Sequence, residues 1–164
     1  MKRLLPIYML FAAWFISFTQ GTAQVSGVYT ELIGQYHTGL FDEGAAEIVA
    51  FDAANQQLFF TNANDNSVVV LDITDPEMPT LVTTIDMSSY GGGINSVAIF
   101  EDIVAVAVQA DPKTDPGKVV FFNTVDASYI ADVTVGALPD MVTFTPDGNF
   151  AITANEGEPN DDYT

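Results

Sequence analysis

Short apolar runs separated by turn-forming residues set the pattern of this chain from Glu47 to Ile85. Runs of β-branched, aromatic and aliphatic residues alternate with segments rich in Asn, Asp and Pro, which is typical of strands joined by tight turns. The pattern predicts four strands, at Ile48–Phe51, Leu58–Thr61, Val68–Ile73 and Leu81–Ile85. Beyond residue 23 no segment shows the apolar period of a helix, so we expect an all-β protein.

The same unit then recurs along the chain. Val49, Val97 and Val142 occupy equivalent places, 48 and 45 residues apart, and a second apolar run follows each of them. A period near 45 residues with four strands per unit is typical of β-propeller blades. We therefore predict a β-propeller-like fold with four-stranded antiparallel blades, of which about two and a half are present. The blades are expected at residues 47–85, 95–135 and 140–164.

Residues 28–36 resemble a fourth strand that lacks its own first three. Leu32 precedes Glu47 by 15 residues, much as Leu81 precedes Asn95 by 14. In propellers a lone outer strand from one terminus commonly completes the last blade, and closing the ring removes open sheet edges. Because propellers have about four to eight blades, residues 24–164 are expected to be the N-terminal part of a longer propeller domain.

The first 23 residues have the organisation of a secretory signal. Lys2 and Arg3 form a positive start, an apolar run extends from Leu4 to Phe18, and Gly21-Thr22-Ala23 supplies the small residues of a cleavage site. The alternative is an uncleaved membrane anchor, but the apolar run is short for a membrane span. We expect a secreted or cell-surface protein with no membrane span after cleavage. The absence of Cys fits a bacterial exported protein.

The chain is strongly acidic, with 22 Asp and Glu against four Lys and Arg and a formal net charge of −18. Such a surface repels nucleic acid and anionic lipid, and it attracts divalent cations or basic partners. Disorder is the alternative explanation of a high net charge. The 12 Phe and 6 Tyr favour a folded acidic protein instead.

Antiparallel order places the unusual segments at one end of the blades. That end collects residues 42–47, 62–66, 91–95, 111–117, 136–140 and 155–162. Carboxylates and Asn carbonyls are hard oxygen donors suited to Ca²⁺ or Mg²⁺. The candidate metal ligands are Glu43, Glu47, Asp140, Glu156, Glu158 and Asp161. The alternative is that the acidic loops merely solvate the protein. No segment has the EF-hand pattern. The opposite end of the blades also carries carboxylates, and these are interpreted mostly as turn-forming residues.

No residue pattern specifies catalysis. His37 is the only histidine, and it is more typical of a hydrogen-bonded loop residue than of a metal ligand. No Gly-x-Ser-x-Gly elbow accompanies it, so a Ser–His–Asp triad is not indicated. The Gly91–Gly93 segment lacks the strand–loop–helix setting of a phosphate site and is interpreted as a flexible turn.

Several longer segments carry a family resemblance. They are EGAAEIVAFD (43–52), LDITDP (71–76), NSVAI (95–99), GKVVFF (117–122), VGALPDMVTFTPDG (135–148) and ANEGEPNDDYT (154–164). With these segments the sequence resembles the choice-of-anchor I family, secreted bacterial proteins related to mesenchyme-specific cell-surface glycoproteins of animal biomineralisation. The resemblance implies a β-propeller-like domain that is exported and held at the surface by a variable C-terminal anchor. Some relatives carry an alkaline-phosphatase label, with no catalytic motif to transfer.

Two hypotheses of function follow. The first is a noncatalytic extracellular propeller that binds Ca²⁺, mineral or a cell-envelope partner through the acidic end of the blades. The alternative is a secreted metal-dependent phosphoesterase that holds its metal with the same carboxylates. Neither hypothesis involves an organic cofactor.

Overall fold

The structure is a computed structural model that describes residues 27, 30–41, 43–160 and 162. The predicted signal, residues 1–23, lies outside the described residues. The chain divides into two compact units, Met1–Glu31 and Leu32–Thr164, and the description that follows concerns the second unit. In the part of the chain that the structure describes, no helix is long and apolar enough to cross a membrane.

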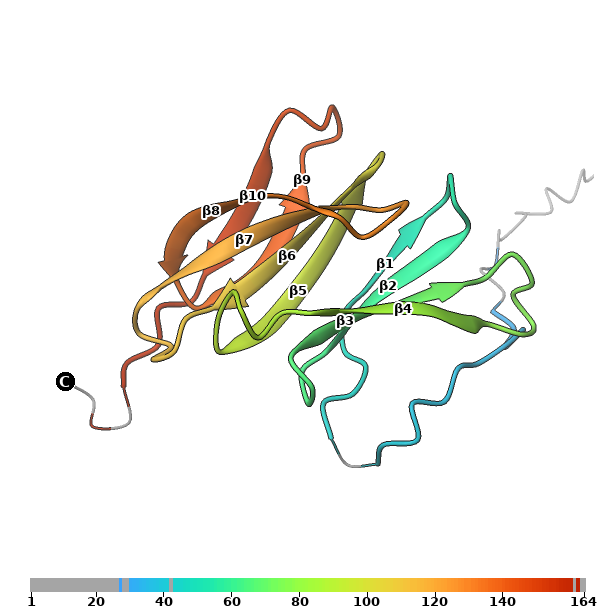
Figure 1. Ribbon diagram of the computed structural model, residues 1–164, viewed down its shortest axis with the longest axis horizontal. Helices are drawn as coiled ribbons and strands as arrows, with labels where there is room; N and C mark the ends of the chain where they lie inside the picture. The colour runs from blue at the N-terminus through green and yellow to red at the C-terminus, as the bar shows by residue number, and fades with distance from the viewer. Residues whose placement is uncertain (1–26, 28–29, 42, 161, 163–164) are drawn as a thin grey trace, which may run out of the picture. The chain divides into compact units, whose positions relative to one another are not determined.

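The described unit is built of antiparallel strands arranged in three sheets (Figure 1). The first sheet has the order β1-β2-β3-β4, the second has the order β5-β6-β7-β8, and the third pairs β10 with β9. The strands are β1 (Val49–Asp52), β2 (Gln57–Asn62), β3 (Ser67–Asp72), β4 (Thr80–Asp86), β5 (Gly93–Phe100), β6 (Ile103–Gln109), β7 (Pro116–Asn123), β8 (Tyr129–Ala137), β9 (Pro139–Phe144) and β10 (Ala151–Asn155). The four strands of the first sheet begin and end within one residue of their predicted runs, and the same order of four strands recurs in the second sheet, which confirms the all-β, propeller-like prediction.

Alternation along the strands gives each sheet two apolar faces. Val49 pairs with Phe60, which pairs with Val69, so these three side chains share one face of the first sheet. Ala50, Phe59 and Val70 pair in the same way on the other face. We call the first of these the back face and the second the forward face, since the second sheet packs against the latter.

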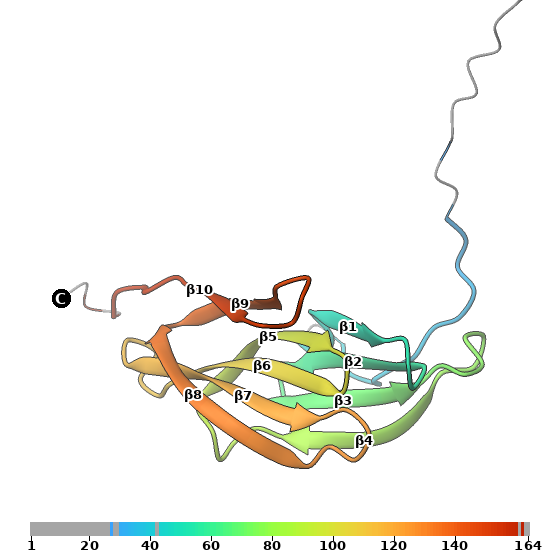
Figure 2. The ribbon, with the colours of Figure 1, turned by 90° about the horizontal axis from the view of Figure 1, so that it is seen from above.

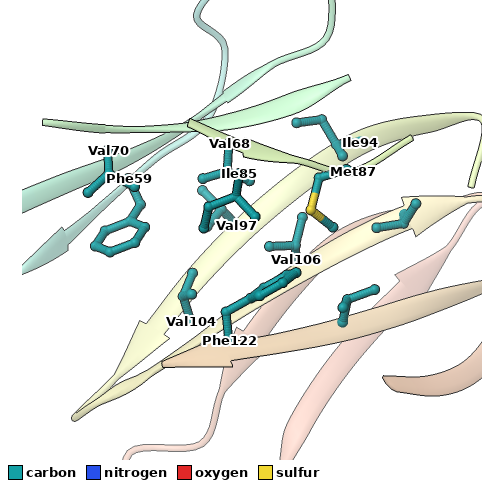
Figure 3. Close-up of a cluster of buried hydrophobic side chains, with 12 residues drawn as sticks. Phe59, Val68, Val70, Ile85, Met87, Ile94, Val97, Val104, Val106 and Phe122 are labelled. Carbon is teal, nitrogen blue, oxygen red and sulfur yellow. The ribbon is translucent and has the colours of Figure 1, made fainter. Parts of the chain in front are cut away.

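The first and second sheets share one apolar core. Phe59, Val68 and Val70 of the first sheet are buried with Val97, Val106 and other residues of the second. Figure 3 shows these side chains pointing toward one another from the two sheets, with Met87 from the β4–β5 link between them. Burying a Val or Phe side chain contributes roughly 1.5–3 kcal/mol, so this cluster is the main source of stability.

The third sheet packs in the same way on the forward face of the second. Val142 is buried against Ala105, Ala107 and Val119. Figure 2 shows the result: β1, β5 and β9 lie along one side of the unit, with β4 and β8 along the other. Each first strand thus occupies the inner position that a propeller blade assigns to it.

The segment that precedes the first sheet differs from expectation. Residues 30–36 form no strand; positions 28 and 29 of the predicted strand 28–36 lie outside the described residues. Instead residues 32–41, which we call the strap, lie over the back face of the first sheet. The Tyr36 ring is 6.3 Å from that of Phe60 and joins the smaller cluster of Phe60, Val69 and Leu71. Apolar packing against this face holds Tyr36 here.

Candidate functional site

The loops at one end of the three sheets meet in a continuous rim, along the lower edge of Figure 1. We define the rim as residues 43–48, 62–66, 87–95, 109–116, 136–140 and 155–160. The Ala63 amide donates to the Gly44 carbonyl at 2.7 Å, which joins the first two segments. The Asn66 side chain donates to the Gly91 carbonyl at 3.0 Å, which joins the first sheet to the link that begins the second. The predicted convergence of these loops is therefore observed.

Asn95 connects the second sheet to the third at the start of their inner strands. Its Nδ2 donates to the Pro139 carbonyl at 3.0 Å and lies 3.4 Å from Oε1 of Gln109. One strand position further on, the Val142 amide donates to Oγ of buried Ser96 at 3.2 Å. Side-chain bonds between sheets fix the spacing of the inner strands, which sets the positions of the rim loops.

The acidic segment after β10 is held against the link between β8 and β9, which is another part of the rim. The Glu156 amide donates to the Leu138 carbonyl at 2.9 Å, and the Gly157 amide donates to the Ala137 carbonyl at 3.2 Å. Glu158 then reaches Lys113, with 2.7 Å between Oε2 and Nζ. An exposed ion pair contributes only about 0–1 kcal/mol, so the backbone bonds position the segment and the ion pair directs its side chain.

A cavity of about 420 Å³ lies beside this ion pair. It is lined by Gly92, Gln109, Ala110, Asp111, Pro112, Lys113, Thr114 and Asn160. The lining offers a carboxylate, an ammonium, a hydroxyl and amide groups within one hollow. Such a set suits a small polar ligand or a hydrated cation rather than an apolar molecule.

The glycine segment at the edge of this cavity is packed closely. A Cβ on Gly91 would lie 2.2 Å from the Gln109 carbonyl oxygen, and the Gly92 amide donates to that same oxygen at 2.8 Å. Gly93 is already the first residue of β5. The interpretation of Gly91–Gly93 as a flexible turn is corrected: these glycines allow the link to approach the end of β6.

The structure places the described members of the predicted metal-ligand set in three segments of the rim. Glu43 and Glu47 lie in the loop before β1, Asp140 is on β9, Glu156 and Glu158 follow β10, and Asp161 lies outside the described residues. Within the described positions, no group of three or more His, Asp or Glu side chains is placed to hold a metal ion. The predicted metal site stays a prediction. His37, which the sequence did not favour as a metal ligand, is exposed on the strap and hydrogen-bonded to Gln35.

Sequence reasoning missed the cavity and the partner of Glu158. Gln109 reads as the end of an apolar strand, and Thr114 as a turn residue. Lys113 carries a usable signal, since beyond residue 3 only Lys113 and Lys118 are basic. A lone cation among acidic loops is expected to pair with one of them, but the sequence does not say with which.

A buried carboxylate lies at the opposite end of the sheets. Asp52 is only 2% exposed, and it accepts hydrogen bonds from the Ala54 amide at 2.9 Å, the Asn55 amide at 3.1 Å and Asn55 Nδ2 at 2.8 Å. Burial acts to raise the pKa of Asp52, but the hydrogen bonds from Asn55, Thr124 and Ala54 outweigh it and hold the pKa below its ordinary value. Thr124 belongs to the second sheet's β7–β8 turn, so this site is an inter-sheet junction.

These features define a β-propeller-like chain with a polar rim, and comparison with known proteins places it in a family. The choice-of-anchor I domain model matches residues 47–164, so the chain belongs to the choice-of-anchor I family. Choice-of-anchor domains are typical of extracellular or cell-surface proteins. A search of curated proteins finds no match.

Two solved structures are similar in fold. One is the hydrazine synthase of Kuenenia stuttgartiensis, with a TM-score of 0.57 and 18% identity over 75% of this chain and 33% of that one. The other is a protein from Lactobacillus plantarum, with a TM-score of 0.56 and 27% identity over 68% of this chain and 35% of that one. The chain thus spans about a third of the length of either structure. The likeness concerns the fold alone.

Proposed function

We propose that this chain is part of a secreted or cell-surface binding protein that acts without catalysis, and that the rim is its binding surface. The observation that supports the proposal best is the cavity of about 420 Å³ beside the Lys113–Glu158 pair, whose lining includes Asp111, Lys113 and Thr114. Family membership adds the expectation of an extracellular location, reached through the predicted signal Met1–Ala23. The partner is a divalent cation, mineral surface or cell-envelope component.

Ca²⁺ is the first ligand to test, because the net charge of −18 concentrates divalent cations and the rim supplies carboxylate and carbonyl oxygens. Calorimetric titration of the purified protein should give heat with a dissociation constant of about 0.1–1 mM, the range of extracellular calcium sites. Glu156→Gln and Glu158→Gln should weaken it, while Asp147→Asn, at the opposite end, serves as the matched control. No heat and an unchanged melting temperature would count against calcium as the ligand.

The phosphoesterase alternative uses the same carboxylates, and a different measurement distinguishes it from the noncatalytic binding protein. A screen of phosphomonoesters with added divalent metals should show no turnover by the purified protein. Turnover that falls in Glu156→Gln and Glu158→Gln would favour the phosphoesterase instead. Turnover that both variants retain would place the activity outside these residues.

A further inference from the structure

A cavity of about 190 Å³ lies between the first and second sheets, at the end opposite to the rim. The strands β2, β3 and β4 supply one wall, and the β7–β8 turn supplies the other. Both walls belong to sheets that already pack against each other, so no further blade is needed to form the cavity. Its lining residues are Gln57, Val70, Val82, Thr83, Thr124, Val125, Asp126 and Ala127.

Gln57 places a polar side chain at a position that is apolar in the second sheet. It begins β2 and pairs with Asp52, just as Ile103 begins β6 and pairs with Phe100. The strand register sets Gln57 between Asp52 and Asp72 on the forward face of the first sheet. The side-chain oxygen of Gln57 is buried and has no hydrogen-bond partner among the described residues. Because buried polar groups are normally paired, a bound hydrogen-bond donor would be favoured here.

The surroundings of the cavity are negatively charged. Asp126 is exposed in the β7–β8 turn, and hydrogen bonds from the hydroxyl and amide of Ser128 hold its pKa below the ordinary value. Asp72 lies beside Gln57, and hydrogen bonds from Thr74 lower its pKa in the same way. Both carboxylates are therefore ionised at neutral pH, and no Lys or Arg is among the described residues that line the cavity. Such a site attracts cations.

Valine side chains give the same cavity an apolar part. Val70 is buried, whereas Val82 and Val125, one from each wall, are 49% and 64% exposed. A lysine side chain combines an aliphatic stem that packs on apolar surface with an ammonium that donates three hydrogen bonds. The cavity is smaller than the roughly 300–1,000 Å³ of sites for drug-sized ligands, so a single side chain suits it.

A metal ion fits this cavity less well than an ammonium does. Ca²⁺ takes about six to eight oxygen ligands, often from several carboxylates. Within the described positions, no three His, Asp or Glu side chains are grouped to hold a metal. An ammonium needs only a few oxygen acceptors, which one carboxylate, one amide and the threonine hydroxyls of the lining can supply.

We propose that this cavity binds a lysine side chain of a basic protein partner. The aliphatic stem packs on Val70, Val82 and Val125, and the ammonium donates to the oxygens of Asp126 and Gln57. The formal net charge of −18 favours encounter with such a partner. Because the cavity and the rim lie at opposite ends of the sheets, its test does not depend on the proposed function of the rim.

Short capped peptides with a central lysine, norleucine or acetyl-lysine test the proposal on the unaltered protein by nuclear magnetic resonance. The lysine peptide should shift the backbone amides of residues 82–83 and 124–127, with a dissociation constant on the order of 1–10 mM at physiological ionic strength. The other two peptides keep the stem but lack the charge, so they should bind about threefold or more weakly. Equal binding of all three peptides, or no shift at these positions, would overturn the proposal.

Variants then assign the contacts. Asp126→Asn should weaken binding of the lysine peptide by about threefold, and Gln57→Ile, which introduces the residue type of the second sheet, should weaken it as well. Asp147→Asn is the matched control and should leave binding unchanged, because Asp147 also accepts an amide two positions further on but lies outside the cavity. Equal losses in Asp126→Asn and Asp147→Asn would overturn the proposal, because they would mean general attraction to acidic loops.

Discussion

Asp52 combines a turn and an inter-sheet contact in one side chain. The sequence pattern predicts a turn former between the first two strands, and the carboxylate indeed accepts the Ala54 and Asn55 amides. The Asn55 side chain that donates to Asp52 also lies 3.5 Å from the hydroxyl of Thr124, which is 69 positions further along the chain. Local turn chemistry is readable from sequence, whereas a partner on another sheet is not.

Asp52→Ala should lower the free energy of unfolding by about 1–3 kcal/mol, the cost of leaving buried hydrogen-bond donors without an acceptor. Denaturant titration measures the change. Asp102→Ala is the matched control, because Asp102 is an exposed residue in the corresponding turn of the second sheet. Its effect should stay within about 0.5 kcal/mol. Equal losses of unfolding free energy in the two variants would mean that the inter-sheet junction at Asp52 contributes no more stability than an exposed turn does.

Asp52 also makes stability depend on pH. Its pKa is lower in the folded state than the ordinary carboxyl value of 3.8, so the unfolded state binds more protons in acid. The stabilisation is complete above the ordinary pKa and is lost as pH falls through the folded pKa. The melting temperature should therefore fall between about pH 5 and pH 2.

Asp52→Asn should show a shallower fall over the same interval when melting is followed by circular dichroism. The fall should not vanish, because hydrogen bonds also lower the pKa values of Asp72, Asp86, Asp132 and Asp147. A variant whose melting temperature follows the wild-type curve in parallel would show that Asp52 does not contribute to the pH dependence.

Among the elements, the β9–β10 hairpin shows what a turn sequence can and cannot predict. Thr145-Pro-Asp-Gly has the composition of a hairpin turn, with Pro at its second position and Gly at its fourth, and it closes the hairpin with the Gly148 amide donating to the Thr145 carbonyl at 2.8 Å. Gly148 has a φ of +68°, in the left-handed region that favours glycine. The structure adds a second requirement: a Cβ here would lie 2.0 Å from the Phe100 ring. The turn is thus also a contact with the second sheet.

Gly148→Ala should destabilise the protein by about 1–2 kcal/mol because alanine is strained in the left-handed backbone conformation. It should destabilise the protein further because the added Cβ displaces the Phe100 ring. Gly157→Ala is a matched control, since Gly157 has a φ of +62° but a Cβ added there would meet no atom within 4 Å. The difference between the two losses, measured by denaturant titration, isolates the contact with Phe100. Equal losses would mean that the ring moves aside without cost.

At the scale of the whole molecule, the repeat carried most of the predictive information. The spacing of Val49, Val97 and Val142 yields three sheets in order, and strand alternation yields their two faces. Residues 30–36 form no strand, but the lone outer strand predicted at 28–36 stays a prediction, because the last blade that it would complete is not among the described strands. The Lys113–Glu158 pair spans 45 positions and the cavity beside it forms only after folding, so neither has a local sequence pattern.

The sheets should differ in local stability because they share cores of different size. The second sheet is covered on both faces, whereas the third has two strands and packs on one side through Val142. Amides of β9 and β10 should therefore exchange with solvent faster than those of β6 and β7. Hydrogen exchange followed by mass spectrometry can compare peptides from 139–155 with peptides from 103–123.

Val142→Ala tests whether the third sheet opens independently of the second. Removing two methyl carbons from the small cluster should speed exchange in β9 and β10 by an amount that corresponds to about 1–2 kcal/mol, while exchange in β6 and β7 changes little. Met141→Ala, on the exposed forward face of the same strand, is the control and should leave both regions nearly unchanged. Equal acceleration in all four strands would mean that the third sheet opens only when the whole unit unfolds.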